Sequence, residues 1–150
     1  MSLIQSFGIS RSGLQVERMR MDVVANNIAN MNSTRQADGS PGPYQRQVLN
    51  IAAQDGSQPF PSLLAQLSGA QSPGGVSATA ISNDPTPGRI SYDPGNPDAD
   101  AQGNVTYPNV DLTVEMSDMM GADRSYQANA TALNAIKSVA QAAIGIGGSH

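Results

Sequence analysis

The fold is decided by a stretch near the beginning of the chain, residues 3 to 31, which reads LIQSFGISRSGLQVERMRMDVVANNIANM. Positions in it that are spaced alternately by four and three residues are mostly apolar, as on the packed face of a coiled-coil helix. These positions are Leu3, Phe7, Ser10, Leu14, Glu17, Met21, Val24, Ile28 and Met31. The spacing predicts a long helix whose apolar seam packs along a second helix.

A matching stretch lies near the end of the chain. Its seam positions are Leu112, Met116, Met119, Asp123, Tyr126, Ala130, Leu133, Lys137, Ala140 and Ile144. Only Asp123 and Lys137 depart from the pattern of small and apolar residues, so this stretch also predicts a helix. We expect the two helices to form an antiparallel hairpin that resembles a coiled coil.

The middle of the chain has a different composition, since all ten prolines lie between Pro41 and Pro108. Clusters of turn-forming residues there punctuate segments in which apolar and polar residues nearly alternate. Short strands are predicted at 44–51, 75–81 and 89–92, and 59–71 is open between a loop and a short helix. The expected fold class is α+β, with a small β-rich insert between two long helices.

The same division predicts the domain organisation. Residues 1–35 and 110–146 form one terminal helical domain, residues 36–109 form the insert, and residues 147–150 form a flexible tail.

Charge and composition exclude several functional classes. The net charge of -4 makes nucleic acid an unexpected partner. The absence of cysteine excludes disulfides, thiolate metal sites and cysteine nucleophiles. No cleavable signal sequence and no apolar run of 18 residues are present, so this criterion alone predicts a cytoplasmic protein without membrane insertion.

The acidic run from Asp93 to Asp100 has oxygen ligands at alternate positions, as in a calcium-binding loop. Counted from Asn96, however, the sixth position is Ala101 where that loop needs glycine, and the twelfth is Tyr107 where it needs glutamate. The run is therefore interpreted as turn chemistry, and no metal site is predicted.

Catalytic side chains are sparse. The only histidine is His150, the last residue, so no Ser-His-Asp arrangement is expected. Asp98 and Asp100 could in principle serve as an acid-base pair, but their sequence context predicts a solvated loop. The chain is expected not to be an enzyme and to need no cofactor.

Two groups of residues allow two interpretations each. Met116, Met119 and Met120 form either a binding face or ordinary helix packing. The asparagines between Asn26 and Asn32 either mark a fraying helix end or bond between helices and fix their register.

Two N-terminal blocks are similar to a known signature. Ser12-Gly13-Leu14 and residues 21–32, MDVVANNIANMN, resemble the N-terminal signature of the axial proteins of the bacterial flagellar rod and hook. Further blocks resemble the members of this family that form the proximal rod. These blocks are Asp84-Pro85 with Pro87, residues 92–100, Gly103, residues 107–110, Glu115-Met116, residues 118–120 and residues 124–129.

The resemblance implies a structural subunit of the flagellar basal body. Such a subunit would assemble with copies of itself, with other rod proteins and with the adaptor between the rod and the MS ring. It would leave the cytoplasm through the flagellar type III export apparatus without a cleaved signal peptide, and join a hollow periplasmic shaft that transmits torque. This implied location replaces the cytoplasmic prediction.

Combining the seams with the resemblance, we expect an assembly interface on the terminal helices. Its predicted residues are Leu14, Met21, Val24, Asn27, Ile28, Met116, Met119, Tyr126, Asn129, Leu133 and Ile144. The alternative is an exported helical module that binds membranes or surfaces, although such helices usually carry many basic residues and Lys137 is the only lysine. An enzyme is the third possibility.

Overall fold

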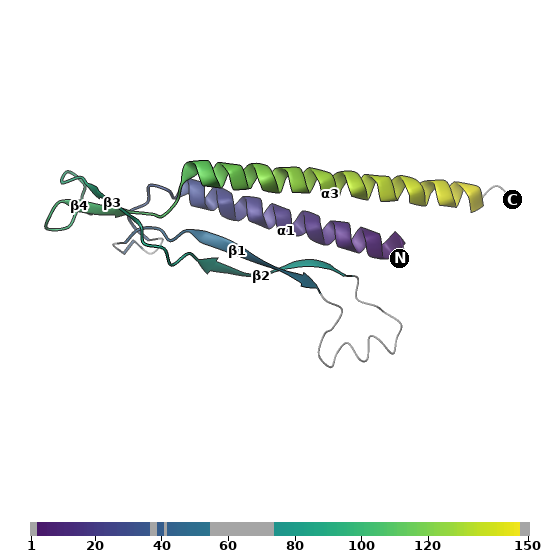
Figure 1. The fold of residues 1–150 in the computed structure, drawn as a ribbon, viewed down its shortest axis with the longest axis horizontal. Coiled ribbons are helices and arrows are strands. Elements are labelled where there is room, and N and C mark those ends of the chain that lie inside the picture. The colour runs from purple at the N-terminus through teal and green to yellow at the C-terminus, as the bar shows by residue number, and fades with distance from the viewer. Residues whose placement is uncertain (1–2, 37–38, 41, 55–73, 148–150) are drawn as a thin grey trace, which may run out of the picture. The chain divides into compact units, whose positions relative to one another are not determined.

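A computed structural model describes residues 3–36, 39–40, 42–54 and 74–147 (Figure 1). The elements are α1 (Leu3–Ala29), β1 (Gln47–Gln54), β2 (Gly75–Asn83), β3 (Arg89–Tyr92), β4 (Asn104–Tyr107) and α3 (Leu112–Gly147). Two long helices enclosing a β-rich insert confirm the α+β prediction. The segment 59–71 and residues 148–150 of the predicted tail lie outside the described residues.

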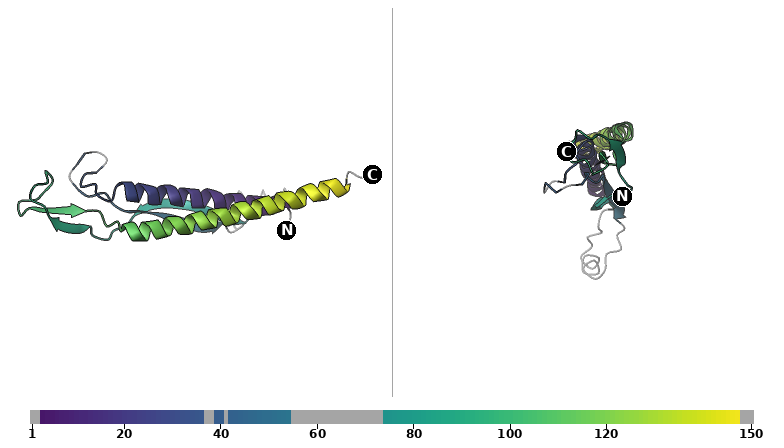
Figure 2. Two further views of the ribbon diagram at one scale, coloured as in Figure 1. Left: turned by 90° about the horizontal axis from the view of Figure 1, so that it is seen from above. Right: turned by 90° about the vertical axis from the view of Figure 1, so that its left-hand side faces the viewer.

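The chain divides into two compact units, and each long helix contributes to both. Unit 1 contains Met1–Met19, Ile51–Thr79 and Ala122–His150, and unit 2 contains Arg20–Asn50 and Ala80–Gly121. In each unit a segment of α1 lies beside an antiparallel segment of α3 (Figures 1 and 2). The helix pairing predicted from the two seams is thus present within both units.

Unit 1 covers α1 on two sides. On one side Gly13 meets α3 so closely that a Cβ there would lie 2.8 Å from Nδ2 of Asn129. On the other, the Ser12 hydroxyl accepts a hydrogen bond from the backbone N–H of Val76 in β2 at 3.2 Å. Within unit 1, helix α1 therefore packs against α3 on one side and β2 on the other, and not only along the one seam that was predicted.

This double coverage explains why one seam describes α1 incompletely. Val16 and Val23 are buried although neither belongs to the predicted seam, and Ser10 and Val24 of the seam are buried as well. A stripe drawn for one partner helix misses the residues that face the strands.

The packed face of α3 also differs from the predicted seam. Glu115 and Ala122 are buried, whereas their neighbours Met116 and Asp123, which the seam included, are exposed. Lys137 and Ile144 of the seam are exposed too. At Met116 and Asp123 the seam was thus placed one residue too late, because the regular spacing was followed past the neighbouring residues Glu115 and Ala122, which are the ones that pack.

The strands differ from their predicted bounds. Strand β1 spans Gln47–Gln54, whereas 44–51 was predicted. It begins later because the Tyr44 N–H donates to the Ser33 carbonyl oxygen and because the Tyr44 and Arg46 side chains enter a polar cluster described below, and it ends three residues later. Strand β2 extends two residues beyond its prediction, to Asn83, and β3 has the predicted bounds. Strand β4 was not predicted, since its four residues were assigned to the turn-rich block.

Strands β3 and β4 form an antiparallel hairpin in unit 2. Arg89 pairs with Tyr107 and Tyr92 with Asn104, and Val105 on one face is only 1% exposed. A Cβ at Gly88 would collide with the Tyr107 carbonyl oxygen, so only glycine permits the strands to approach this closely at that end.

The predicted turn chemistry lies in the loop between β3 and β4. The Asp100 carboxylate accepts hydrogen bonds from the backbone N–H groups of Gln102 and Asn104, at 2.9 and 2.8 Å. Asn96 accepts one from the N–H of Asp98 at 3.0 Å, and Gly103 has a positive φ of 82°. These side chains replace backbone partners in a tight loop, as turn-forming residues do.

Helix α3 begins where its sequence predicts. The Asp111 carboxylate accepts hydrogen bonds from the backbone N–H groups of Thr113 and Val114, at 2.7 and 3.3 Å. An aspartate that accepts from the first free N–H groups of a helix is a strong N-cap.

Candidate assembly interface

Asn27 is the centre of a buried polar cluster in unit 2. Its side chain is 1% exposed and makes four hydrogen bonds. The amide nitrogen donates to the Gln47 carbonyl oxygen at 2.9 Å and to Oε2 of Glu115 at 3.2 Å. The amide oxygen accepts from the Tyr44 hydroxyl and from the Gln47 N–H, both at 2.9 Å. Every donor and acceptor of this amide is satisfied.

Arg46 supplies the positive charge of the cluster. Its Nε donates to Oε1 of the fully buried Glu115 at 2.6 Å, and its terminal nitrogens lie 3.5 Å from Asp84 and 3.7 Å from Asp118. One guanidinium therefore faces three carboxylates. Burial of Arg46 opposes its charge, but the hydrogen bond to Glu115 and the charges of Glu115 and Asp84 outweigh burial and raise the pKa of Arg46.

Two neighbouring groups respond to the same environment. Burial, and then the charge of Glu115, raises the pKa of the Tyr44 hydroxyl, which remains a hydrogen-bond donor. Hydrogen bonds from Thr86, and then Arg46, lower the pKa of Asp84 although burial opposes this. The surroundings of Arg46 and Asp84 thus favour the charged form of each.

The cluster decides between the two interpretations of the asparagines. Asn27 joins α1 to Glu115 of α3 and to the start of β1, which is the bonding between helices that would fix their register. Asn26 is exposed, and Asn30 lies just after the end of α1. The Asn30 backbone N–H and its amide both donate to the Asn26 carbonyl oxygen, at 3.1 and 2.9 Å, so the helix end is tied by hydrogen bonds. The bonding interpretation therefore holds for Asn27, and the fraying interpretation finds no support at Asn30.

Sequence reasoning missed Arg46 and Glu115, although a signal was present. Arg46 is one of only two basic residues between positions 36 and 110, where acidic residues prevail. An arginine in a segment where acidic residues prevail is a candidate for a fixed ion pair, since guanidinium groups form bidentate contacts with carboxylates.

The predicted interface residues fall into three classes of burial. Val24 and Asn27 are buried. Those that are half-buried are Leu14, Met21, Ile28, Met119, Asn129 and Leu133. Met116, Tyr126 and Ile144 are exposed. The first two classes contribute to packing within the chain, and the third is available to a partner.

Other large apolar side chains of α3 are exposed as well. Large apolar side chains that are exposed on this helix are Leu112, Val114, Met116, Met120, Tyr126, Val139 and Ile144. Leu112, Met116 and Met120 are four residues apart and therefore share one helix face. We name Leu112, Met116 and Met120 the α3 stripe. Of the two interpretations of the methionines, a binding face fits Met116 and Met120, and packing fits Met119.

Other kinds of site find less support in the described residues. They contain no group of three or more His, Asp or Glu side chains placed to hold a metal ion. Neither described helix carries an apolar stretch long enough to span a bilayer. Asp98, one of the two acids considered for catalysis, is bonded to Thr34 at 2.7 Å and to Arg35 at 2.8 Å.

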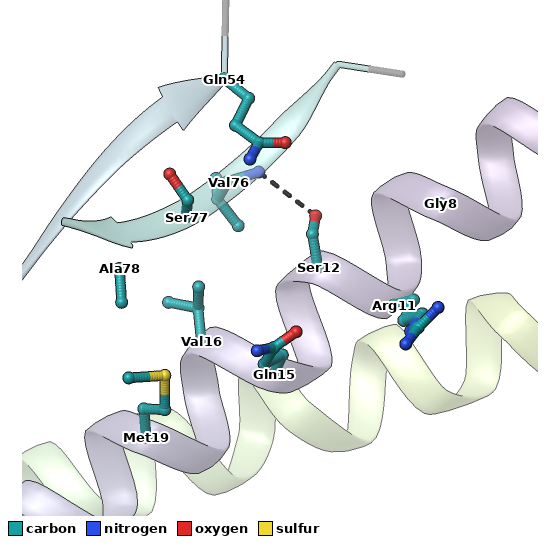
Figure 3. Close-up of a pocket in the computed structure, with 10 residues that line it drawn as sticks. All are labelled: Gly8, Arg11, Ser12, Gln15, Val16, Met19, Gln54, Val76, Ser77 and Ala78. Carbon is teal, nitrogen blue, oxygen red and sulfur yellow. Dashed lines mark hydrogen bonds between the residues drawn. The ribbon is translucent and has the colours of Figure 1, made fainter. Parts of the chain in front are cut away.

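A groove in unit 1 lies between α1 and the strands and has a volume of about 460 Å³ (Figure 3). Ser12 and Val16 of α1 face Val76 of β2 across it, and Arg11 also lines it. Its lining mixes apolar and polar side chains and includes one charged residue.

Comparisons with known proteins agree with the motifs. The family model described as flagella basal body rod protein matches residues 8–35, and the one described as flagellar basal body rod FlgEFG protein C-terminal matches residues 101–146. Both matches fall mainly on the terminal helices.

Individual relatives match almost the whole chain. The flagellar basal-body rod protein FlgC of Bacillus subtilis is 42% identical, covering 98% of this chain and 99% of its own. The protein of the same name from Yersinia enterocolitica is 42% identical over 93% of both chains, and that from Salmonella typhimurium is 37% identical over 93% of both. By identity and by coverage, the chain belongs to the family of flagellar basal-body rod proteins FlgC.

Proposed function

We propose that this chain, a structural subunit of the flagellar basal-body rod, builds the rod through its two terminal helices. Copies assemble with other rod proteins into a hollow shaft that transmits torque from the motor. The observation that carries this proposal is the α3 stripe, a row of large apolar side chains left exposed on a helix of 36 residues. Large apolar side chains that gather on one exposed helix face are typical of protein-protein contact sites.

Buried polar contacts support a role that requires stiffness. Within unit 2 the Asn27 amide and the Arg46 guanidinium tie α1, β1 and α3 together through hydrogen bonds that leave no unpaired group on Asn27. Satisfied buried networks make a structure rigid and specify a single arrangement. A subunit that carries torsional load benefits from both properties.

Each predicted domain makes a different set of contacts in the rod. Residues 1–35 and 110–146 supply the contacts along the shaft, and residues 36–109 supply contacts on its outside. The subunit performs no catalysis and binds no cofactor. Its partners are copies of itself, other rod proteins and the adaptor at the base of the rod, and it reaches the periplasm through the type III export apparatus without a cleaved signal.

Deleting the gene in a flagellated host tests the structural role. We expect loss of swimming in soft agar and purified basal bodies that lack a completed rod, and both should be restored by the gene supplied in trans. Complete rods in the deletion strain would refute the role.

A substitution in the buried polar cluster tests whether that cluster contributes to rod assembly. Glu115→Gln removes the charge that pairs with Arg46, so we expect basal bodies with fewer completed rods at normal cellular levels of the protein. Asp123→Asn on the same helix is the control, because Asp123 is exposed and, among the described residues, its side chain bonds only to Gln127 of its own helix.

A further inference from the structure

Two large apolar side chains project from one face of the β3–β4 hairpin. Ile90 is 68% exposed and Tyr92 is 72% exposed. They are two residues apart in β3 and therefore share a face, opposite to the one that buries Val105. We name Ile90 and Tyr92 the hairpin knob.

The loop beneath the knob is held in one conformation. The Asp93 N–H donates to the Gly103 carbonyl oxygen at 2.9 Å, which closes the base of the loop. Thr34 and Arg35 hold Asp98 from the segment that follows α1. A rigid element that presents apolar side chains loses little conformational entropy when it binds, which suits an interaction surface.

Asp93 directly follows the knob residue Tyr92 in the sequence and adds a negative charge at the end of β3. Its carboxylate makes no hydrogen bond or ion pair within the described residues. The knob is thus two apolar anchors next to a free acid.

The groove of unit 1 offers the complementary features. Met19, Val76 and Ala78 line it and are half-buried, so they supply apolar surface, and Arg11 supplies the charge (Figure 3). Arg11 has no ion-pair partner in the part of the chain that the structure describes. A volume of about 460 Å³ lies within the range of sites that hold a few side chains or a small ligand.

The net charges of the two units also have opposite signs, as Asp93 and Arg11 do. The sequence segments of unit 1 contain four basic and three acidic residues, whereas those of unit 2 contain four basic and nine acidic residues. Net charges of opposite sign favour contact between unit 2 of one copy and unit 1 of another. Such a contact joins different surfaces of identical subunits, which generates rings or open helical assemblies.

We propose that the hairpin knob of one copy of this chain docks in the groove of unit 1 of a second copy. Ile90 and Tyr92 cover Met19 and Val76, and Asp93 pairs with Arg11. The proposal rests on the structural role proposed above and names one contact between neighbouring copies.

Disulfide trapping tests the contact, because the natural chain has no cysteine that could interfere. Ile90→Cys and Gln15→Cys are produced as separate chains in one host, where Gln15 lines the groove. A disulfide between these two chains can only join different copies. In oxidised basal bodies we expect the mixed dimer to be about tenfold more abundant than with Ala132→Cys in place of Gln15→Cys, since contact raises the effective concentration of the thiols. Ala132 is exposed on α3 of the same unit.

A charge exchange tests the Asp93–Arg11 pair independently. Asp93→Arg and Arg11→Asp should each reduce swimming, and the double variant should regain most of it, because the pair then has reversed signs. Arg124→Asp, on α3 of the same unit, is the control and should not rescue Asp93→Arg.

The outcomes separate this proposal from the structural role. If the chains are present in basal bodies but neither the mixed dimer nor the rescue is found, the docking is wrong and the structural role stands. If the wild-type chain is absent from basal bodies, the structural role is wrong and the docking falls with it.

Discussion

An amide is the one side-chain group that could occupy the position of Asn27. It must donate to the Gln47 carbonyl and to the Glu115 carboxylate while it accepts from the Tyr44 hydroxyl and the Gln47 N–H. Aspartate has the same shape but no donors when ionised, and it would repel Glu115. Glutamine has the donors but is one methylene longer in a fully packed site.

Asn27→Ala should therefore lower the free energy of unfolding by about 1 to 3 kcal/mol, because it leaves buried polar partners unsatisfied. Thermal unfolding followed by circular dichroism measures this change. Asn26→Ala is the matched control. Asn26 is exposed, and alanine is the better helix former, so its effect should stay within about 0.5 kcal/mol or be stabilising. Equal losses for both variants would contradict the role of the cluster.

Asp98 makes the stability of the hairpin loop depend on acidity. Hydrogen bonds from Arg35 and Thr34 hold the pKa of Asp98 below its usual value of 3.8. Because the folded pKa is the lower one, the stabilisation is complete above the unfolded pKa and is lost as the pH falls through the folded pKa.

Amide exchange in β4 should therefore accelerate in the wild type as the pH is lowered below about 4, after correction for intrinsic exchange rates. In Asp98→Asn much of this acceleration should disappear, and the remainder comes from Asp100, whose pKa is lowered by hydrogen bonding to Asn104. Asp93→Asn is the control, since Asp93 makes no side-chain hydrogen bond within the described residues. An unchanged acid dependence in Asp98→Asn would contradict the assignment.

At the scale of elements, two helical glycines differ in what surrounds them. A Cβ at Gly13 of α1 would lie 2.8 Å from Nδ2 of Asn129, whereas a Cβ at Gly121 of α3 would meet nothing within 4 Å. Replacing glycine by alanine inside a helix gains about 1 kcal/mol where space is free. Gly121→Ala should show this full gain in chemical denaturation.

Gly13→Ala should show a smaller gain or a loss, because the Asn129 side chain must move away. The difference between the two variants measures how closely α1 and α3 approach in unit 1. Equal gains would mean that this approach is looser than the structure shows.

The β3–β4 hairpin contains a second such pair of glycines. Gly88→Ala would push its Cβ into the Tyr107 carbonyl oxygen, which belongs to the backbone and has little freedom to move, whereas a Cβ at Gly95 approaches only Asp93, at 3.7 Å. We expect Gly88→Ala to cost about 1 to 3 kcal/mol and to raise amide exchange in β4. Gly95→Ala should leave that exchange unchanged, and protected β4 amides in Gly88→Ala would refute the steric account.

Most helices and strands could be predicted from the sequence. The errors concern packed faces and a strand that no regular pattern of large apolar residues marks. Periodicity identifies long helices because many residues repeat one spacing, and it placed both α1 and α3. It missed the packed faces where the buried residue is Glu115 or Ala122, since no large apolar side chain marks them. It also missed β4, whose Asn104 and Thr106 pair with β3 in a hairpin too short to show alternation.

At the scale of the whole molecule, the chain exposes large apolar residues although its buried core is small. The buried apolar side chains among the described residues are Val16, Val23, Val24, Val105, Pro108 and Ala122. The candidate site could be predicted in part from the sequence, because the resemblance directs attention to the terminal helices. The sequence could not predict which residues on these helices face a partner, since the exposure of a side chain depends on tertiary packing, such as the covering of α1 by the strands.

The α3 stripe therefore supports a prediction about assembly that is separate from folding. Met116→Asp and Met120→Asp place a charge on an exposed face, so the helix content and thermal midpoint of the purified chain should change little. In the host, either variant should prevent rod completion, because a contact between subunits would have to bury an unpaired charge. Ser117→Asp is the control, since it adds the same charge to an exposed neighbour that is not part of the stripe. Basal bodies with complete rods in all three strains would show that the stripe faces no subunit, whereas a failure that includes Ser117→Asp would point to charge on α3 in general.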